Sequence, residues 1–265
     1  MSLPEPSPDA AVLVTGASSG IGSELARQLA ERGHGLILVA RRRDRLDELA
    51  ERLRLEHGIR VEVEACDLAD DAERGALVER LTGSERHIAG VCNNAGFGTY
   101  GRFPDLPLAR ELEEVRLNVL ALHHLTGAFL SGMVERGVGA ILNVASIAGA
   151  QPIPGQATYG ATKAFVVSFS EALHAELAGT GVSCTALCPG PVRTEFPKVA
   201  GMAHIQAPDF VWATPEEVAR AGIEGMIRGR RTVTPGVTNR IVSTAGRFAP
   251  RSLLLPVAGR ITARA

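Results

Sequence analysis

The chain has 265 residues, long enough for one α/β domain with a large buried core and short for two domains. Hydrophobic residues make up 45% of it, a share that excludes an intrinsically disordered protein. The formal net charge of -1 gives no basic footprint, so no nucleic-acid partner is expected. The sequence shows neither an apolar run of the roughly 20 residues that cross a bilayer nor a signal-peptide pattern at its start. We therefore expect a cytoplasmic protein without a transmembrane segment.

Strands and helices are expected to alternate after a flexible N-terminal arm, residues 1–10. Short apolar runs predict strands, and apolar residues at helical spacing predict helices. The predicted strands are 11–15, 36–40, 60–65, 88–92, 140–145, 182–187 and 232–234, and the predicted helices are 20–32, 44–57, 70–81, 108–136, 157–178 and 215–227. This alternation is typical of parallel strands with crossover helices. We predict a single-domain, Rossmann-type, doubly wound parallel sheet of about seven strands over residues 11–238.

Two further features bear on packing and metal binding. Residues 239–265 mix arginine with leucine, valine and proline, so this extension would pack on the domain, form a subunit contact or touch a membrane surface. The four cysteines have no C-x₂-C or H-x₃-H companion, which favours small buried thiols over a metal site; they are Cys66, Cys92, Cys184 and Cys188. Without a disulfide framework, a reducing compartment fits best.

A glycine-rich turn follows the first predicted strand, with the spacing G-x₃-G-x-G. Gly16 would permit the tight turn, Gly20 the approach of backbone to a pyrophosphate, and Gly22 the close packing of helix on sheet. The N–H groups at the start of the helix would face the phosphates, and hydroxyl donors can add to them. The predicted nucleotide-binding residues of this turn are Gly16, Ser18, Ser19, Gly20, Ile21 and Gly22.

The end of the second strand bears on the choice between NAD and NADP. An NAD site usually has an acid there to bind the ribose 2′-hydroxyl. This chain instead has three successive arginines, residues 41–43, and a guanidinium can pair with a 2′-phosphate through two hydrogen bonds. An ordinary charged helix start would place these cations unfavourably against the helix dipole. The arginines therefore favour NADP(H).

A tyrosine and a lysine are the candidate reacting groups. Tyr159 and Lys163 are four residues apart at the start of a predicted helix, so they share one of its faces. An ammonium near a phenol stabilises the phenolate and lowers the phenol's pKa from about 10. Ser146 follows the fifth strand, at the edge of a parallel sheet where ligands bind, and could hydrogen-bond a substrate oxygen.

In combination, these motifs resemble those of the short-chain dehydrogenase/reductase family, in its single-domain branch. The resemblance covers about residues 11–234, with T-G-x₃-G-I-G at 15–22, Asp67-Leu68, N-N-A-G at 93–96, Asn118, Ser146, Y-x₃-K at 159–163 and P-G-x-V-x-T at 189–194. It implies a catalytic set of Ser146, Tyr159, Lys163 and Asn118. No motif of the catalytic set is missing.

The same resemblance implies the remaining roles. Asn118 would hold a water that links Lys163 to solvent. Arg41 stands at the family's NADP-type position. The other implied cofactor contacts are Asp67 and Leu68 at the adenine, and Val192 and Thr194 at the nicotinamide carboxamide, with Tyr159 and Lys163 beside the ribose. Asn93 and its neighbours would lie along the adenosine side and also brace the sheet. A homodimer or homotetramer through the long crossover helices is implied as well.

The sequence predicts an NADP(H)-dependent oxidoreductase that moves a hydride between nicotinamide and a carbonyl/alcohol pair. Aromatic and apolar residues after two strands suggest a hydrophobic small-molecule substrate, unless they only pack their loops; they are Phe97, Tyr100, Phe103, Phe196, Met202, Phe210 and Trp212. Two alternatives remain at this point. One is a non-catalytic NADP-binding sensor, and the other is an NAD-linked alcohol dehydrogenase.

Overall fold

The computed structural model describes residues 3–202, 211–252 and 255–256, and within them the chain forms one parallel sheet of seven strands. The order is β3-β2-β1-β4-β5-β6-β7, and every neighbouring pair is parallel. The strands are β1 (Ala10–Thr15), β2 (Leu36–Ala40), β3 (Val61–Ala65), β4 (His87–Asn93), β5 (Gly139–Val144), β6 (Val182–Leu187) and β7 (Thr232–Val233). The predicted doubly wound, Rossmann-type fold is confirmed.

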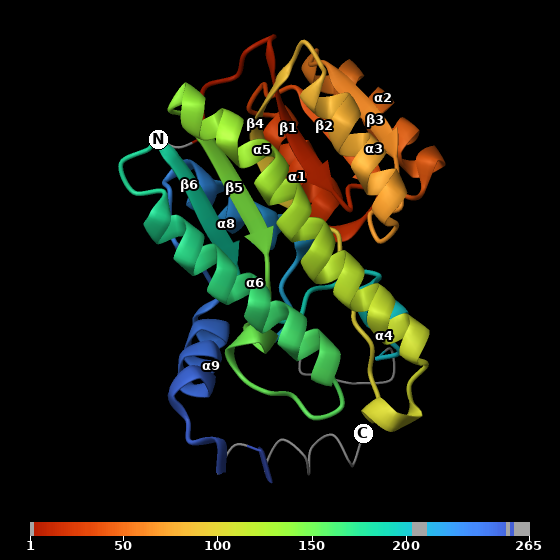
Figure 1. Ribbon diagram of the computed structural model, residues 1–265, viewed down its shortest axis with the longest axis vertical. Helices are drawn as coiled ribbons and strands as arrows, with labels where there is room; N and C mark the ends of the chain where they lie inside the picture. The colour runs from red at the N-terminus through yellow and green to blue at the C-terminus, as the bar shows by residue number, and fades with distance from the viewer. Residues whose placement is uncertain (1–2, 203–210, 253–254, 257–265) are drawn as a thin grey trace.

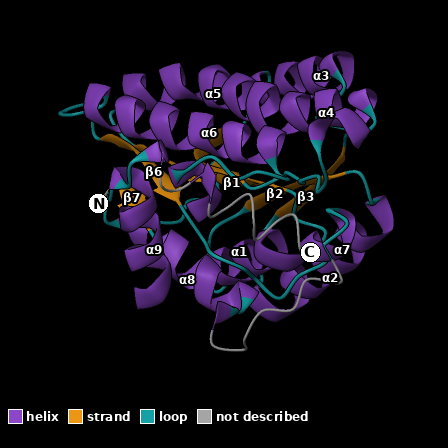
Figure 2. Cartoon of the chain, turned by 90° about the horizontal axis from the view of Figure 1, so that it is seen from below, coloured by secondary structure: helices purple, strands orange, loops and turns teal. Residues whose placement is uncertain are grey.

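Helices cover both faces of the sheet, giving three layers (Figures 1 and 2). One face carries α3 (Asp71–Thr82), α4 (Leu108–Val115), α5 (Leu122–Arg136) and α6 (Ala157–Glu176). The other carries α1 (Gly20–Ala30), α2 (Arg43–His57), α8 (Pro215–Ile227) and α9 (Val237–Phe248), with the short α7 (Phe196–Val199) on the same side. The strand order reverses between β1 and β4, and such a switch point opens a ligand crevice at the carboxyl ends of the strands.

The strands are apolar along their whole length because both of their faces are covered. Within β1, Val12 and Val14 belong to the core beneath α1, α2 and α8, whereas Leu13 belongs to the core beneath α3 and α5. All three side chains are fully buried. A two-residue period thus fills two separate cores from one strand, which fixes its register.

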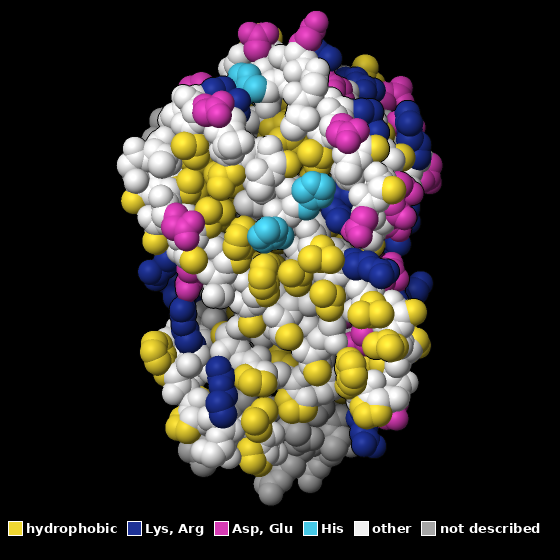
Figure 3. Space-filling model, in the orientation of Figure 1, with side chains coloured by type: hydrophobic (Ala, Val, Ile, Leu, Met, Phe, Trp, Pro, Cys, Tyr) yellow, Lys and Arg dark blue, Asp and Glu magenta, His cyan; other side chains and the backbone are white. Residues whose placement is uncertain are grey.

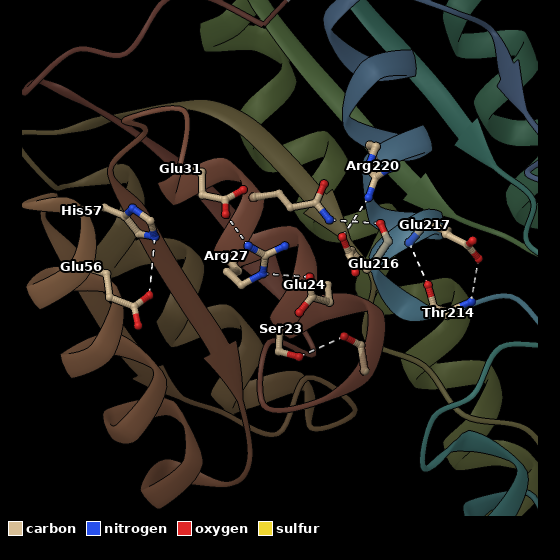
Figure 4. A network of polar contacts seen from close by, with 12 residues as sticks. Ser23, Glu24, Arg27, Glu31, Glu56, His57, Thr214, Glu216, Glu217 and Arg220 are labelled. Atoms are coloured by element: carbon tan, nitrogen blue, oxygen red, sulfur yellow. Dashed lines mark hydrogen bonds and ion pairs between the residues drawn. The ribbon is translucent and has the colours of Figure 1, made fainter.

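The α8 helix is fixed at its start and against α1 (Figure 4). The Thr214 hydroxyl accepts from the Glu217 N–H, and the Glu217 carboxylate accepts from the Thr214 N–H, a capping box ahead of Pro215. From α1, the Gln28 side-chain amide donates to the Glu216 carbonyl. The predicted boundaries of α8, residues 215–227, are confirmed.

The helix predicted over 108–136 is continuous but not uniform. Between α4 and α5 lies a π-helical turn, Arg116–Ala121. The run Leu108–Arg136 is long and apolar enough to cross a membrane by length and composition alone, with a mean hydropathy of 1.3. Leu125, Phe129 and Met133 are buried in the core beneath it, whereas Leu112 and Leu120 are exposed. Core packing therefore accounts for one face of the run, and its other face is an apolar surface.

The described parts near both ends of the chain pack on the domain, which was not expected of the N-terminal arm. Leu3, within the segment expected to be a flexible arm, is buried in the core and contacts Gly90 on β4. Ala10 already belongs to β1. At the other end, α9 begins at Val237 and packs on the 3₁₀ turn η3 (Ile147–Ala150) after β5. The apolar side chain of Leu3 packs beside a glycine of the strand. The polar and proline-rich composition of the surrounding segment does not predict this contact.

Candidate active site

The glycine-rich turn between β1 and α1 has the predicted geometry. Gly16 and Gly20 have positive φ values of 64° and 59°, which a residue with a side chain adopts only under strain. A Cβ on Gly22 would lie 2.2 Å from the Gly16 carbonyl oxygen, so this position leaves no space for a side chain. The turn borders a cleft of about 590 Å³ at the carboxyl ends of the strands. Of the six predicted residues of the turn, all but Gly22 line this cleft; they are Gly16, Ser18, Ser19, Gly20 and Ile21.

Two of the three arginines after β2 also line the cleft. Arg41 lies 3.7 Å from Asp67 and 3.5 Å from Glu113. Arg42, which the predicted site omitted, donates to the hydroxyls of Ser18 at 3.0 Å and Ser19 at 2.8 Å. The run of arginines was the signal for Arg42, but only the fold shows that its guanidinium lies over the glycine turn.

Arg42 also bridges the cleft to the segment after β6. Its guanidinium donates to Glu195 at 2.8 Å, and Arg45 donates to the other oxygen of the same carboxylate at 2.9 Å. These bonds lower the pKa of Glu195 to about 2, and the bond from Arg45 has the larger effect of the two. The nucleotide turn and the opposite wall of the cleft are thus joined by a shared carboxylate.

The predicted adenine-side residues divide into two groups. Asp67 and Leu68 line the cleft as expected. Asn93 does not: it is buried, and its amide donates to Thr126 at 3.0 Å and to Asn143 on β5 at 2.9 Å. Its side chain braces β4 against its neighbours, which is one of the two roles implied for it, and it is not part of the cleft lining. The next residue, Asn94, lines the cleft and donates to the Thr15 carbonyl of the glycine turn.

The fold brings Ser146, Tyr159 and Lys163 together on the wall of the same cleft. Ser146 follows β5 and caps η3, accepting from the Ala148 N–H at 3.1 Å. The Ser146 hydroxyl lies near enough to the Tyr159 phenol to lower the pKa of that phenol. The Lys163 ammonium donates to the Val144 carbonyl at 2.8 Å and lies 5.8 Å from the centre of the Tyr159 ring. All three side chains are buried.

The pKa of Tyr159 shifts in the direction opposite to the one expected from its spacing to Lys163. Burial raises it to about 12, opposed by the Ser146 hydrogen bond and reinforced by the charge of Glu114. Burial lowers the pKa of Lys163 to about 8, while Glu114 opposes that change. The desolvation of the phenolate sets the direction of the shift, and Lys163 is not among the groups that change the Tyr159 pKa. At neutral pH the phenol therefore keeps its proton and can donate it.

Asn118 lies in the π turn, on the inner side of the helix. Its Oδ1 accepts from the Phe97 N–H at 3.1 Å, and its Nδ2 donates to the Phe97 carbonyl and to Thr162 on α6. A Cβ on Gly96 would lie 2.8 Å from Asn118 Oδ1 and 3.6 Å from Lys163 Nζ, so both side chains border this glycine. Widened turns of this kind occur frequently at functional sites.

Two buried carboxyl groups near these residues were not predicted. Glu114 is fully buried and accepts from the Thr99 hydroxyl at 2.9 Å. Burial raises its pKa to about 7, with the Thr99 hydrogen bond opposing the shift. Glu111 accepts from Thr158, the neighbour of Tyr159. In the sequence, Glu114 is marked only by its position four residues before Asn118. Acids are too common on the helices of a globular domain for this position to single it out.

The remaining wall of the cleft is mostly apolar, with the predicted Val192 and Thr194 and the polar side chains of Arg110, Gln151 and Gln156 among its residues. The Phe196 ring lies 5.3 Å from the Tyr159 ring, centre to centre. Of the predicted rim, Phe97, Phe196, Met202 and Trp212 line the cleft, whereas Tyr100 and Phe103 are not part of its lining. Phe210 lies outside the described residues.

The site therefore combines a nucleotide-binding turn with a serine, a tyrosine and a lysine at one crevice, as a nicotinamide-dependent oxidoreductase requires. Comparison with known proteins agrees. A family model described as short chain dehydrogenase matches residues 10–202. The chain is 40% identical over 187 residues to sulfoacetaldehyde reductase 2 of Chromohalobacter salexigens, covering 70% of this chain and 73% of that protein.

A second relative and a solved structure extend the match. The NADP-dependent 3-hydroxy acid dehydrogenase YdfG of Escherichia coli is 37% identical over 218 residues, covering 79% of this chain and 86% of that one. A short-chain dehydrogenase from Sphingobium yanoikuyae in complex with NADPH superposes with a TM-score of 0.82 at 36% identity, covering 93% and 95%. The chain belongs to the short-chain dehydrogenase/reductase family.

Proposed function

We propose that the protein reduces a hydrophobic carbonyl compound with NADPH and uses Tyr159 as the proton donor. The class of reaction, NADP(H)-dependent oxidoreduction, follows from its family. The observation that carries the proposal is the single cleft that Ser146, Tyr159, Lys163 and the glycine turn share. A hydride donor, a proton donor and a carbonyl can meet only if their sites are continuous.

The residues of the nucleotide half fit the cofactor. The glycine turn offers backbone N–H groups at the start of α1 for a pyrophosphate, at a place where a Cβ on Gly22 would collide. Arg41 and Arg42 would pair with the 2′-phosphate, which an acid at this position would repel. Asp67 and Leu68 would border the adenine, with Val192 and Thr194 at the carboxamide. NADPH supplies the hydride when bound.

The residues of the catalytic wall act on the carbonyl oxygen. As negative charge develops there, Ser146 would donate a hydrogen bond and Tyr159 its proton, since its raised pKa keeps the phenol protonated at neutral pH. The Lys163 ammonium would support the tyrosinate left behind and hold the ribose. Asn118, fixed by Phe97 and Thr162, would position a water through which Lys163 exchanges protons with solvent.

The substrate class follows from the apolar wall. Phe97, Phe196, Met202 and Trp212 line the cleft, and a cleft of this kind selects ligands by apolar contact. Arg110 lies 3.6 Å from the centre of the Phe97 ring, so its charge is held against an aromatic face. A hydrophobic ketone, aldehyde or ketoacyl group fits this surface better than a small anionic carbonyl.

The test is consumption of NADPH with a panel of hydrophobic and polar carbonyl compounds, with the alcohol product identified. The proposal predicts turnover that is faster with apolar substrates and with NADPH than with NADH. NADPH binding with no turnover across the panel would instead identify a sensor. Faster turnover with NADH would identify an NAD-linked alcohol dehydrogenase.

The same protein would assemble as a homodimer or homotetramer through the outer side of α4, α5 and α6, as its family resemblance implies. Hydrophobic side chains gather across this face in Figure 3, and Leu112, Leu120 and Phe165 on it are exposed. The Phe165 and Phe169 rings stack at 5.7 Å, giving the face a flat aromatic part. Light scattering should show an oligomer that Leu120→Asp dissociates.

A cytoplasmic location fits the state of the cysteines. All four are unpaired and buried, and burial raises the pKa of Cys92, Cys184 and Cys188 to about 12. Thiols with such pKa values carry almost no thiolate at neutral pH, so they are packing groups rather than nucleophiles. Labelling of the native protein by a thiol reagent should be slow at all four.

A further inference from the structure

Charge is segregated along the chain. Residues 225–265 contain no aspartate, glutamate or lysine and eight arginines, namely Arg228, Arg230, Arg231, Arg240, Arg247, Arg251, Arg260 and Arg264. The whole chain has 28 basic and 29 acidic residues, so the preceding part has 20 basic against 29 acidic. The net charge of the whole chain is therefore near zero only because the basic residues 225–265 offset the acidic residues 1–224.

The α9 helix within this basic end carries an outward apolar stripe. Val237, Ile241 and Phe248 are 71%, 64% and 78% exposed. At 3.6 residues per turn, these three side chains lie within about 40° of one another around the helix axis. The buried residues of the helix, Asn239 and Gly246, lie on the opposite side, about 170° away.

Contacts with the domain hold α9 in this orientation. A Cβ on Gly190 would collide with the Asn239 side chain, and one on Gly246 with the side chain of Gln151. Arg247 forms an ion pair with Glu171 of α6 at 2.8 Å, and Arg231 lies 3.8 Å from the same carboxylate. The inner side of the helix is therefore fixed on the domain, and the apolar stripe faces outward.

We propose that α9 docks the protein on an anionic lipid surface. Large apolar side chains grouped on one face of a helix and accompanied by arginines match the requirements of the headgroup boundary. Figure 3 shows hydrophobic and basic side chains together where Figure 1 shows α9. Each arginine near an anionic surface strengthens partitioning about fivefold.

The charge argues for lipid over a second copy of the chain. Two copies joined through α9 would bring the same arginines against one another, and like charges across an interface oppose association. Arg240 and Arg251 are exposed, and no carboxylate in the described part of the chain forms an ion pair with either. An anionic membrane supplies both the missing counter-charge and an apolar layer for Val237, Ile241 and Phe248.

Docking through α9 would bring the cleft close to the membrane. The inner side of α9 packs on Gly190 and Gln151, which line the cleft, and on η3, which Ser146 caps. A helix is about 10 Å wide with its side chains, so this wall would lie about that far from the lipid. This consequence, unlike the docking itself, rests on the proposed function: a hydrophobic carbonyl would reach the cleft from the membrane.

The test is flotation of the full chain with vesicles of phosphatidylcholine alone and of phosphatidylcholine with phosphatidylglycerol. Binding should be at least tenfold tighter to the anionic vesicles and should weaken as salt is added. The double variant Ile241→Asp, Phe248→Asp should lose at least tenfold, and Arg240→Glu should lose several-fold. Leu55→Asp is the matched control, because Leu55 is 80% exposed on α2 and should leave binding unchanged.

Four results would overturn the proposal. The first is equal binding to neutral and anionic vesicles, and the second is binding that survives the double variant. The third is a dimer in solution that the double variant dissociates, which would assign the stripe to a second copy. The fourth is binding to an oligonucleotide but not to vesicles. Vesicle binding requires no turnover, so its failure and the failure of the proposed reaction are separate results.

Discussion

The nucleotide half of the cleft and its substrate half are built by different means. The nucleotide half, formed by the turn after β1 and the end of β2, depends on backbone shape: Gly16 and Gly20 have positive φ, and Gly22 lies against the Gly16 carbonyl. The substrate half depends on side chains from distant segments, such as Phe97 and Phe196. The backbone shape of the nucleotide half can be predicted from consecutive residues. The side-chain wall of the substrate half forms only when distant segments come together on folding.

The largest expected effect is on turnover, and it should leave cofactor binding in the nucleotide half unchanged. Tyr159→Phe removes the proton donor and should reduce turnover about 10²- to 10⁴-fold, while NADPH still binds to the unchanged glycine turn. Steady-state rates and NADPH titration measure the two quantities. Tyr100→Phe is the matched control, because Tyr100 is not part of the cleft lining and should keep its rate. Full activity in Tyr159→Phe would remove the tyrosine from the mechanism.

A change in the nucleotide half should alter cofactor choice alone. Arg41→Asp places a negative charge beside the 2′-phosphate site and should lower the NADPH-to-NADH preference about 10- to 100-fold. The ratio of kcat/KM for the two cofactors measures this. Arg43→Asp is the control: Arg43 pairs with Asp47 at 3.1 Å and does not line the cleft. An unchanged ratio in Arg41→Asp would contradict the assignment of the phosphate site.

Outside the cleft lining, the buried Glu114 should make stability depend on pH. Its pKa is about 7 in the folded protein and 4.5 without burial, so unfolding releases a proton between these values. Stability from the buried neutral acid is complete below about pH 4.5 and is lost as the pH rises through 7. Denaturant titrations should therefore show Glu114→Gln gaining about 2 kcal/mol over the wild type at pH 8, and little at pH 5.

Glu113→Gln is the control for this prediction. Glu113 is partly exposed beside Arg110, and its replacement should change stability little at either pH. Equal stability of Glu114→Gln and the wild type at pH 8 would show that the carboxyl group ionises without cost in the folded protein.

The smallest effect concerns the apolar wall. Phe196→Ala removes a ring that lies beside Tyr159 and should raise the KM of apolar carbonyls about 3- to 10-fold, with kcat changed less. Phe103→Ala, on an exposed residue outside the cleft, should leave both constants unchanged. Equal losses for apolar and polar substrates would mean that Phe196 only packs its own segment.

The sequence alone predicted the sheet, the nucleotide turn, and Ser146, Tyr159 and Lys163 as candidates, since each of these follows from local pattern. It could not decide between Asn93 and Asn94, because which of two neighbours faces the cleft depends on how β4 packs against β5. The π-helical turn at Asn118 and the burial of Glu114 depend on how the long helix packs on α6. The residues next to Asn118 and Glu114 in the sequence do not indicate that packing.

The direction of the Tyr159 pKa was missed for a related reason. Spacing to Lys163 indicates only that the two side chains share a helix face. It does not reveal how completely the phenol is buried, or that the ammonium is held by the Val144 carbonyl. Desolvation is a property of the whole fold, so the direction of this pKa shift cannot be obtained from a motif.

The most direct test of the central claim follows the hydride itself. NADPH with both hydrogens at the hydride-donating carbon of nicotinamide replaced by deuterium would be incubated with the protein and a hydrophobic ketone. The alcohol product would be analysed by mass spectrometry. We predict deuterium on the carbinol carbon with the wild type and at least a 10²-fold slower transfer with Tyr159→Phe. NADPH that binds while its label never reaches any carbonyl of a broad panel would contradict the account.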